Sequence, residues 1–447
     1  MNSLWRKQTK EIAGNAKELD KKPDRITWDV IVIGAGMAGL LTAFYLQERG
    51  KKVLVLEADT IASGQTEKTT AKITSQHGIK YSTLIKSVDM ETARGYALAN
   101  QKAIREYARL IKERQIDCQF EWKTSYLYSS REENGLQAEK KAALAVGIDV
   151  VSDYQGELPF PVEHVIGFPK QAQFSPLRFL ENIAAELHIL EHCRVLEIKE
   201  HVVFAEKKVF TAEKIVVATH YPIMDMPGYY FLRQHQSRSY VLALSGCEKV
   251  DAMYYGVDAD GLSFRQAGDY LLLGGASHRT GVHKCNEAYE YLERRAKAYY
   301  PDCRVEAKWS AQDCMPHDGI PFIGKYSLFT PNIYVITGLQ KWGMSLSMVA
   351  AMILRDELCG EENPYSKIFS PQRFHLRAGF SKLMTDVFVS SKGLIMGLCS
   401  SKPSCAHMGC ELVWNPSEQT WDCPCHGSRY TKEGELIDNP SVKNIEE

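Results

Sequence analysis

The sequence predicts an α/β nucleotide-binding domain, an α+β domain joined to it, and a C-terminal segment rich in cysteine and histidine. The first prediction rests on a glycine-rich turn between a buried strand and a helix, within residues 28–57. The second rests on runs within residues 230–280 that alternate polar and apolar, a period typical of a half-exposed antiparallel sheet. The third rests on residues 405–430, which hold four cysteines and two histidines.

The composition is that of a globular protein large enough for two or three domains. The chain has 447 residues, 45% of them apolar, and a formal net charge of −1, which gives no attraction to nucleic acid or to an anionic membrane. Residues 1–22 are polar and charged and lack the apolar stretch of a signal peptide. No apolar run approaches the ~20 residues that span a bilayer. We therefore expect a cytoplasmic protein without a membrane span or a nucleic-acid partner.

The glycine-rich turn lies in the context that a dinucleotide site requires. A short apolar run ends directly before Gly34-Ala-Gly36-Met-Ala-Gly39, and a helical stretch and a second apolar strand follow before Glu57. Gly34 permits the tight turn, Gly36 lets the backbone approach a pyrophosphate, and Gly39 lets helix and strand pack closely. The helix N-terminus favours phosphate, and Glu57 would accept hydrogen bonds from ribose hydroxyls. We find one such fingerprint, so we do not expect a second, NAD(P)H-binding domain.

The fingerprint alone does not distinguish NAD from FAD, and the far end of the domain favours FAD. Residues 214–223 indicate another buried strand that leads into a turn. Residues 318–324 are followed by a strand at 332–338 and by an apolar helix that starts near Lys341. The dipole at the N-terminus of this helix would stabilise the negative charge that reduction places on an isoalloxazine ring.

Several uncommon strings resemble the FAD-dependent amine oxidase group that includes D-amino acid oxidase, glycine oxidase and sarcosine oxidase. Three of them are TTAKITSQHG at 69–78, WSAQDCMPHDGIPFIG at 309–324 and LQKWGM at 339–344. More closely, the chain resembles the bacterial branch of FAD-dependent oxidoreductases that carry a C-terminal Rieske domain. The resemblance implies a Rossmann-like FAD-binding domain of the glutathione-reductase type, an α+β substrate domain, and a small all-β Rieske-like C-terminal domain.

The resemblance also predicts how the chain is divided. It implies an N-terminal extension (1–27), an oxidoreductase part (28–377) and a truncated Rieske-like part (378–447). Within the oxidoreductase part, we expect FAD-binding segments at about 28–80, 165–225 and 305–360, and substrate-domain segments at about 81–164 and 226–304.

The residues that would hold the FAD follow from the fingerprint and from the resemblance, position by position. The resemblance places the string that begins at Thr69 near the phosphates and flavin, and Val195 at the adenine through its backbone. Cys314 does not fall at the offset at which sarcosine oxidases attach their flavin, so we expect a free buried thiol and non-covalent FAD. The predicted FAD-binding residues are Gly34, Gly36, Met37, Gly39, Glu57, Ala58, Thr69, Thr70, Ala71, Lys72, Val195, Ala218, Thr219, Asp318, Gly319, Gly338, Trp342, Gly343 and Met344.

The substrate side is less well defined by the sequence. An amine oxidase of this fold must hold the substrate's Cα–H over flavin N5 and keep the amine neutral, so orientation does most of the work. An arginine would clamp a carboxylate with two parallel bonds. Each candidate could equally be an ordinary surface or sheet-pairing residue, and the sequence does not name the substrate. The candidate catalytic residues are Arg238, Tyr240, Arg265, His278 and Lys341.

The C-terminal segment holds two ligand pairs, Cys405-x-His407 and Cys423-x-x-His426. Two cysteines and two histidines are the ligand set of a Rieske [2Fe–2S] centre, in which one iron takes both thiolates and the other both imidazoles. Zinc could use the same four atoms in a tetrahedron, and an empty site is the remaining alternative. We expect both imidazoles to point to solvent or to a partner, because they are the natural exit for an electron.

The rest of this segment resembles Rieske proteins rather than zinc modules. Cys410 and Cys425 resemble the disulfide pair that ties the two ligand loops together, and Tyr430 matches a donor to a cysteine sulfur. The segment is short, because only residues 378–404 precede the first ligand and the chain ends without a clear final strand. A domain of this size has little apolar core and would depend on its cluster, its disulfide and docking.

The predicted function is that of a FAD-dependent oxidoreductase. We expect it to oxidise a small amine or amino acid and to pass the electrons through the [2Fe–2S] cluster to an external acceptor that the sequence does not identify. A flavin takes two electrons and the cluster carries one, so their combination lets hydride chemistry feed a one-electron carrier. One alternative is a plain FAD oxidase that uses O₂ and has a structural or zinc-binding appendage. Another is a flavin-bearing sensor or binding protein without enzymatic activity.

Overall fold

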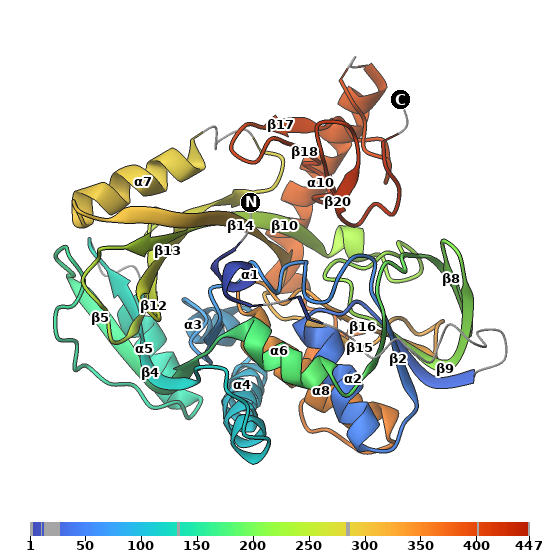
Figure 1. The fold of residues 1–447 in the computed structure, drawn as a ribbon, viewed down its shortest axis with the longest axis horizontal. Helices are drawn as coiled ribbons and strands as arrows, with labels where there is room; N and C mark the ends of the chain where they lie inside the picture. Colours follow the sequence, from blue (N-terminus) through green and yellow to red (C-terminus); the bar gives the residue numbers. More distant parts are fainter. Residues whose placement is uncertain are drawn as a thin grey trace.

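The computed structural model describes residues 3–9, 11–12, 27–131, 135–282, 287–399 and 402–445. Figure 1 shows two large sheets and a small C-terminal one. The central strands of the first sheet run parallel and are buried on both faces, which accounts for their uniformly apolar sequences. Its strands, in spatial order, are β15 (Phe322–Lys325), β16 (Ile333–Thr337), β9 (Val209–Val217), β1 (Thr27–Ile33), β2 (Val53–Leu56) and β6 (His188–Leu190), with β8 (Val202–Ala205) beside β9 and β7 (Val195–Lys199) beside β8.

Helix α2 (Met37–Glu48) follows β1 directly, as the glycine-rich turn predicts. It is almost wholly buried because α8 (Gly343–Leu358) packs against it and α6 (Pro176–Ala184) lies close by. Helix α8 begins at Gly343, two residues after Lys341, near which the sequence predicts the start of an apolar helix. The two packed helices therefore bring together the turn predicted to bind the pyrophosphate and the turn predicted to contact the isoalloxazine.

The second large sheet contains the alternating runs of residues 230–280. It is antiparallel except where β11 runs parallel to β4. Its strands, in spatial order, are β14 (Arg304–Pro316), β10 (Gln234–Ser245), β13 (Tyr270–Arg279), β12 (Ser263–Ala267), β11 (Met253–Gly256), β4 (Glu121–Ser129), β5 (His164–Gln173) and β3 (Lys72–Ile73). Helix α7 (Ala288–Tyr299) packs on β10 and β13 of this sheet, and α5 (Leu136–Ala145) packs on β5. Helix α3 (Tyr81–Ser87) packs against α5, and α4 (Met90–Glu113) packs against α8.

A short helix from the predicted N-terminal extension belongs to the core. This helix, α1 (Leu4–Gln8), buries Trp5 to 1% exposure. The indole Nε1 of Trp5 donates a hydrogen bond to the carbonyl oxygen of Thr69 at 2.7 Å, and the Arg265 guanidinium lies 5.1 Å from its ring. The extension therefore supports the loop that the sequence assigns to the FAD.

The C-terminal module comprises a long helix and a small antiparallel sheet. Helix α10 (Leu376–Cys399) replaces the strands that the resemblance would place before the first ligand loop, and α9 (Ser366–Phe369) precedes it. A Cβ on Gly393 would lie 2.7 Å from Cys425 Sγ, so glycine lets the helix approach the ligand loops. Figure 1 shows the module, in red, beside β10 and β14. Its strands are β17 (Val413–Asn415), β18 (Thr420–Asp422), β19 (Arg429–Tyr430) and β20 (Leu436–Asp438), the last a final strand that the sequence did not show.

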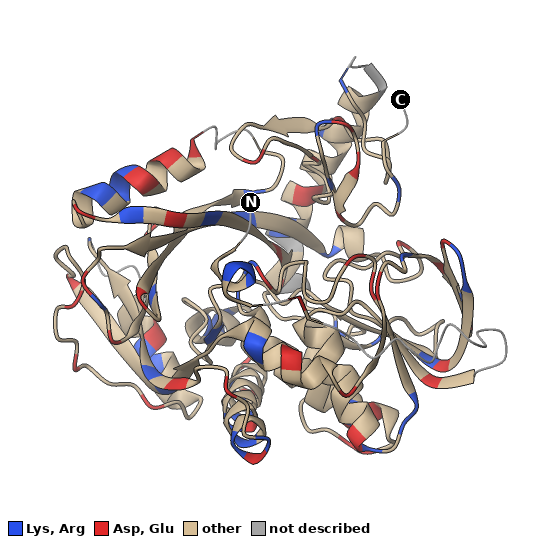
Figure 2. Cartoon of the chain, in the orientation of Figure 1, with Lys and Arg blue, Asp and Glu red and all other residues tan. Residues whose placement is uncertain are grey.

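Charged residues of both signs share the surface of the molecule. The chain has 54 lysines and arginines against 55 aspartates and glutamates. Figure 2 shows the two signs mixed over helices and sheets in this view. Among the described helices, none has both the length and the apolar character needed to cross a membrane.

Candidate functional site

A cavity of about 700 Å³ is lined by residues from both large sheets. This volume is within the range of small-molecule and cofactor sites, roughly 300–1,000 Å³. It lies against the glycine-rich turn after β1 and the first turn of α8. The predicted FAD residues that line it are Gly34, Gly36, Met37, Glu57, Ala58, Thr69, Thr70, Lys72, Val195, Ala218, Thr219, Trp342, Gly343 and Met344.

The three fingerprint glycines fit a bound pyrophosphate. Gly34 has a φ of +107°, and a Cβ there would lie 2.6 Å from the carbonyl oxygen of Ala218. A Cβ on Gly39 would lie 1.9 Å from the carbonyl oxygen of Gly34, so glycine is needed where helix α2 packs on β1. At Gly36 a Cβ would meet only Thr66 Oγ1, at 3.1 Å, so this residue faces the cavity. The backbone can therefore come close to a phosphate group at this turn.

Two side chains from later in the sequence form hydrogen bonds with the backbone of this turn. Glu57 accepts hydrogen bonds from the backbone N–H groups of Ala35 at 2.7 Å and of Asp59 at 3.0 Å. Burial raises the pKa of Glu57, while these backbone bonds oppose the shift. Thr66 Oγ1 accepts from the backbone N–H of Met37 at 2.9 Å and so holds the start of α2. No sequence motif marks Thr66, so its role appears only in the folded structure.

Five predicted FAD residues do not line the cavity. Asp318 is bound by Arg373 at 2.8 Å and by His375 at 3.1 Å, and it ties the chain after α9 to the end of β14. Burial raises its pKa, but the charge of Arg373 and the bonds from both partners outweigh burial and lower it overall. Gly338 has a φ of +74°, and a Cβ there would lie 2.4 Å from Pro316 Cγ. The five are Gly39, Ala71, Asp318, Gly319 and Gly338.

A second cavity of about 470 Å³ adjoins the first and shares Tyr255, Lys341 and Trp342 with it. The indole of Trp342 stacks on the His77 ring, with centroids 4.7 Å apart. Lys341 Nζ lies 3.0 Å from Asp313 Oδ2. Burial opposes the charge on Lys341, but Asp313 raises its pKa overall. Of the five candidate catalytic residues, the first cavity is lined by Tyr240 and Lys341.

The other three candidates, Arg238, Arg265 and His278, do not line either cavity. The Arg265 guanidinium donates to Gln173 Oε1 and to the carbonyl oxygen of Phe174, both at 3.0 Å. Burial lowers the pKa of Arg265 to about 9. His278 Nε2 lies 3.1 Å from Tyr240 Oη, so this histidine contacts a cavity residue from outside.

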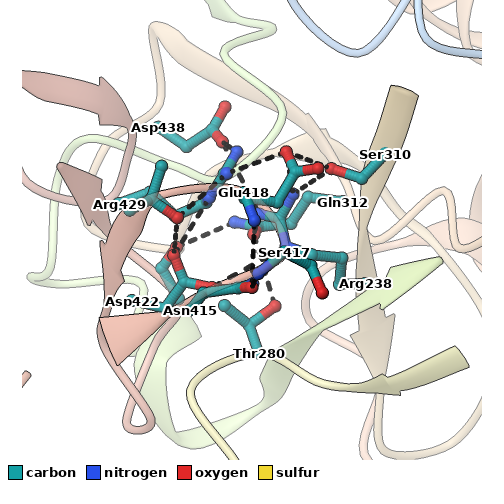
Figure 3. Close-up of polar contacts among 12 residues, drawn as sticks. Arg238, Thr280, Ser310, Gln312, Asn415, Ser417, Glu418, Asp422, Arg429 and Asp438 are labelled. Carbon is teal, nitrogen blue, oxygen red and sulfur yellow. Dashed lines mark hydrogen bonds and ion pairs between the residues drawn. The ribbon is translucent and has the colours of Figure 1, made fainter. Parts of the chain in front are cut away.

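Arg238 lies in a buried ion cluster between β10 and the C-terminal module (Figure 3). It lies 3.9 Å from Asp422, 3.9 Å from Asp438 and 4.0 Å from Glu418. Arg429 reaches the same three carboxylates, at 3.2, 2.9 and 3.3 Å. Burial opposes ionisation of Asp422, but the charges of Arg429 and Arg238 lower its pKa overall. Arg238 therefore joins the C-terminal module to the oxidoreductase part.

The predicted iron ligands converge in the C-terminal module. Cys405 and Cys423 hydrogen-bond to each other, and this bond lowers the pKa of Cys405 to about 6. Tyr430 Oη lies 3.3 Å from Cys405 Sγ, as the resemblance predicts. Cys410 and Cys425 form the predicted disulfide between the two ligand loops.

The geometry of the four ligands suits two irons better than one zinc. The His407 and His426 rings lie 5.2 Å apart at 88°, and both Nδ1 atoms are buried without a hydrogen-bond partner. No three of these four described side chains bring their ligand atoms within 4.8 Å of one another. A single zinc, with bonds of about 2.0–2.3 Å, would require a tighter group. A [2Fe–2S] cluster would use both orphaned nitrogens and both thiols.

The prediction that both imidazoles point to solvent or to an external partner is wrong. His426 is 3% exposed, and the side chain of His407 is 7% exposed. His407 Nε2 lies 2.7 Å from Asp225 Oδ1, and the His426 ring packs against Phe231 with centroids 5.8 Å apart. The segment that follows β9 covers both rings, a tertiary contact that no local sequence pattern shows.

Fold and site together define a flavin-dependent oxidoreductase joined to an iron–sulfur module. Residues 29–357 match the family described as FAD dependent oxidoreductase (DAO), and residues 389–447 match the Rieske [2Fe-2S] domain. The chain belongs to this oxidoreductase family and carries a C-terminal Rieske domain. Its cofactors are FAD and a [2Fe–2S] cluster, and the predicted fold class and family are confirmed.

Similar proteins support both halves of this assignment. The YhfW protein of Bacillus subtilis (strain 168), a Rieske 2Fe-2S iron–sulfur protein by name, is 35% identical over 476 residues, 94% of this chain and 93% of YhfW. The cytochrome b6-f complex iron–sulfur subunit 3 of Nostoc sp. is 31% identical over 119 residues, 26% of this chain and 62% of that subunit. The crystal structure of glycine oxidase from Geobacillus kaustophilus shares the fold, with a TM-score of 0.66, 19% identity, and coverage of 78% of this chain and 100% of that one.

Proposed function

We propose that the protein oxidises a small amine or amino acid at the FAD cavity and passes the electrons through the Rieske centre to an external one-electron acceptor. When bound, FAD supplies a two-electron acceptor and the [2Fe–2S] cluster a one-electron carrier. The substrate loses two electrons and two protons, and its C–N single bond becomes the C=N double bond of an imine. The external acceptor takes up the two electrons one at a time.

The observation that carries this proposal is that the C-terminal module forms part of the FAD cavity wall. The amide of Asn439, directly after β20, donates to the carbonyl oxygens of Thr219 at 2.8 Å and Tyr221 at 3.0 Å. The module that carries the predicted iron ligands therefore also lines the cavity. The module residues that line the cavity are Leu436, Ile437, Asp438, Asn439, Ser441 and Val442.

Buried hydrogen bonds connect the same wall to an iron ligand. Gln236 Nε2 on β10 donates to the carbonyl oxygens of His426 at 2.8 Å and of Asn439 at 2.9 Å. Gln312 Nε2 on β14 donates to the carbonyl oxygen of Gly427 at 2.8 Å. With the ion cluster of Figure 3, these bonds hold the module against the oxidoreductase part. Such docking supports electron passage without a displacement of the module.

The cavity walls support an amino acid or amine as substrate. Tyr240, Tyr255 and Trp342 line the cavity and supply flat apolar surface. The ion pair of Lys341 and Asp313 offers one cation and one anion at 3.0 Å, which complements the carboxylate and the amino group of an amino acid. The glycine oxidase fold agrees with this class of substrate. We propose Tyr240, Tyr255 and Lys341 as substrate contacts.

Anaerobic screening of amines and amino acids tests the proposal. A substrate should bleach the flavin absorbance, and the electron paramagnetic resonance signal of a reduced [2Fe–2S] cluster should follow. Iron and acid-labile sulfide should be present, without zinc. The matched control is Cys423→Ser, which should bleach with the same substrate but give no cluster signal. If a bleaching substrate leaves the wild-type cluster oxidised and only O₂ restores the flavin, the protein is a plain oxidase instead.

A further inference from the structure

One segment touches the FAD cavity and both iron-ligand histidines. This bridge segment, residues 218–231, begins after β9 and ends within the short helix η3 (Tyr230–Leu232). Ala218, Thr219 and Ile223 line the cavity. Asp225, two residues after Ile223, contacts His407, and the last residue of the segment packs on His426.

The contacts at the far end of the bridge segment cover the histidine edge of the centre. Asp225 Oδ1 lies 2.7 Å from His407 Nε2, and Asp225 keeps a 41% exposed side chain. His407 Nδ1, the other ring nitrogen, is buried without a hydrogen-bond partner. The carboxylate therefore engages one ring nitrogen and leaves Nδ1 available to bind an iron. Carboxylate partners fix the tautomer and the orientation of metal-bound imidazoles in this way.

We propose that Asp225 is a positioning residue for electron entry, and that the histidine edge of the cluster is the face through which electrons arrive from the FAD cavity. The inference rests on the proposed relay and specifies its route. Each transfer moves one electron from the reduced flavin to the cluster, and the external one-electron acceptor reoxidises the cluster at another face. The sequence predicted that electrons leave the cluster through the two imidazoles. In this proposal they instead arrive there from the flavin.

The negative charge of Asp225 should also affect the reduction potential of the cluster, separately from its hydrogen bond to His407. A negative charge beside a ligand opposes the addition of an electron to the cluster, so it lowers the reduction potential. Loss of the charge should raise the potential even where a hydrogen bond remains. Loss of the hydrogen bond should loosen His407 and slow the transfer from the flavin. A residue that only packs would alter neither quantity.

Two variants of the full-length holoprotein separate these effects. Asp225→Asn keeps a hydrogen-bond acceptor for His407 without the charge, whereas Asp225→Ala removes both. The control is Glu433→Gln, which removes an exposed carboxylate of the same module. The measurements are iron and sulfide content, redox titration of the cluster signal, and anaerobic stopped-flow reduction of the cluster after photoreduction of the flavin.

We expect both Asp225 variants to keep the cluster and to show about a tenfold higher ratio of reduced to oxidised cluster at a fixed potential, equivalent to ~59 mV for one electron. Transfer from the flavin should remain near the wild-type rate in Asp225→Asn and fall at least tenfold in Asp225→Ala. Glu433→Gln should match the wild type in both measurements.

An unchanged potential in Asp225→Asn together with an unchanged rate in Asp225→Ala overturns the inference. If Asp225→Ala loses its iron, the reduction potential of the cluster in Asp225→Asn decides the matter. A raised potential supports the inference, and an unchanged one overturns it. A wild-type cluster that stays oxidised beside reduced flavin is a different result, because it removes the proposed relay itself.

Discussion

Arg238 on β10 and Asp422 on β18 lie 3.9 Å apart, and each side chain is only 1% exposed. They belong to the five-residue ion cluster in which two guanidinium groups meet the carboxylates of Glu418, Asp422 and Asp438. Buried charges of this kind are costly to leave unpaired. The cluster therefore makes the docking of the module sensitive to a single arginine.

Replacement of Arg238 by methionine should loosen this docking. The variant leaves the buried carboxylate of Asp422 and the partly buried carboxylates of Glu418 and Asp438 to one arginine. Removal of one partner from a buried ion group costs about 3–5 kcal/mol. We expect a lower urea midpoint and faster proteolysis of the C-terminal module. Arg294→Met is the control, because Arg294 has a 63% exposed side chain and should change the free energy of unfolding by less than about 0.5 kcal/mol. Equal unfolding of both variants would contradict the structural role of Arg238.

Replacement of Gly36 by valine should remove the flavin without unfolding the protein. A Cβ at Gly36 meets only Thr66 Oγ1, at 3.1 Å, so the added side chain projects into the cavity where the pyrophosphate is expected. The purified variant should be colourless, with near-native circular dichroism. Gly39→Ala provides the contrast, because its Cβ would lie 1.9 Å from the carbonyl oxygen of Gly34 and should disturb folding itself. A yellow, fully loaded Gly36→Val protein would mean that the nucleotide lies elsewhere.

The sequence predicted what local patterns determine. Gly34 and Gly39 need glycine because of a positive φ and a close backbone approach, respectively, whereas Gly36 faces the cavity, and the structure shows these differences. The alternating runs of residues 230–280 became strands β10, β12 and β13 because a two-residue period specifies a half-buried strand. The spacing of Cys405, His407, Cys423 and His426 likewise reflects two compact loops.

Tertiary contacts account for what the sequence did not show. Arg238 was a candidate for binding a substrate carboxylate, but it pairs with acids from the module almost two hundred positions later in the chain. Asp225 and Trp5 carry no motif, and their roles follow from the packing of segments far apart in sequence. Asn439 lines the FAD cavity only because the module docks beside it. A single sequence contains no signal for such pairings.

The cluster ligands can be tested separately from the flavin. Cys405→Ser and Cys423→Ser should each lose iron and sulfide and keep FAD, because the thiols belong to the module and do not line the FAD cavity. Tyr430→Phe should keep the cluster but lower its potential, since the hydroxyl group 3.3 Å from Cys405 Sγ stabilises the more negative, reduced state. Metal analysis and a redox titration provide the measurements. An unchanged potential in Tyr430→Phe would mean that this contact does not act on the cluster.

Lys72 makes the stability of the protein depend on pH above neutrality. Its Nζ donates to the carbonyl oxygen of Tyr254 at 2.8 Å and to Ser263 Oγ at 2.7 Å. Burial, with a smaller effect of the nearby Arg265 charge, lowers the pKa of Lys72 to about 7. In the unfolded chain a lysine titrates near pH 10.4. Between about pH 7 and 10, the unfolded state therefore binds up to one proton more than the folded state.

The free energy of unfolding should accordingly rise with pH across this window because of Lys72, by up to about 1.4 kcal/mol per pH unit. Below pH 7 both states are protonated, and the full cost of the buried charge is present. Lys72→Met removes this contribution, so its advantage over the wild type should shrink as the pH increases from 7 to 9 in urea titrations. Lys72→Gln retains N–H donors for Tyr254 and Ser263 without a charge. Its difference from the wild type should change with pH in the same way as that of Lys72→Met. If both variants keep a constant difference from the wild type over this range, Lys72 is not the group that titrates.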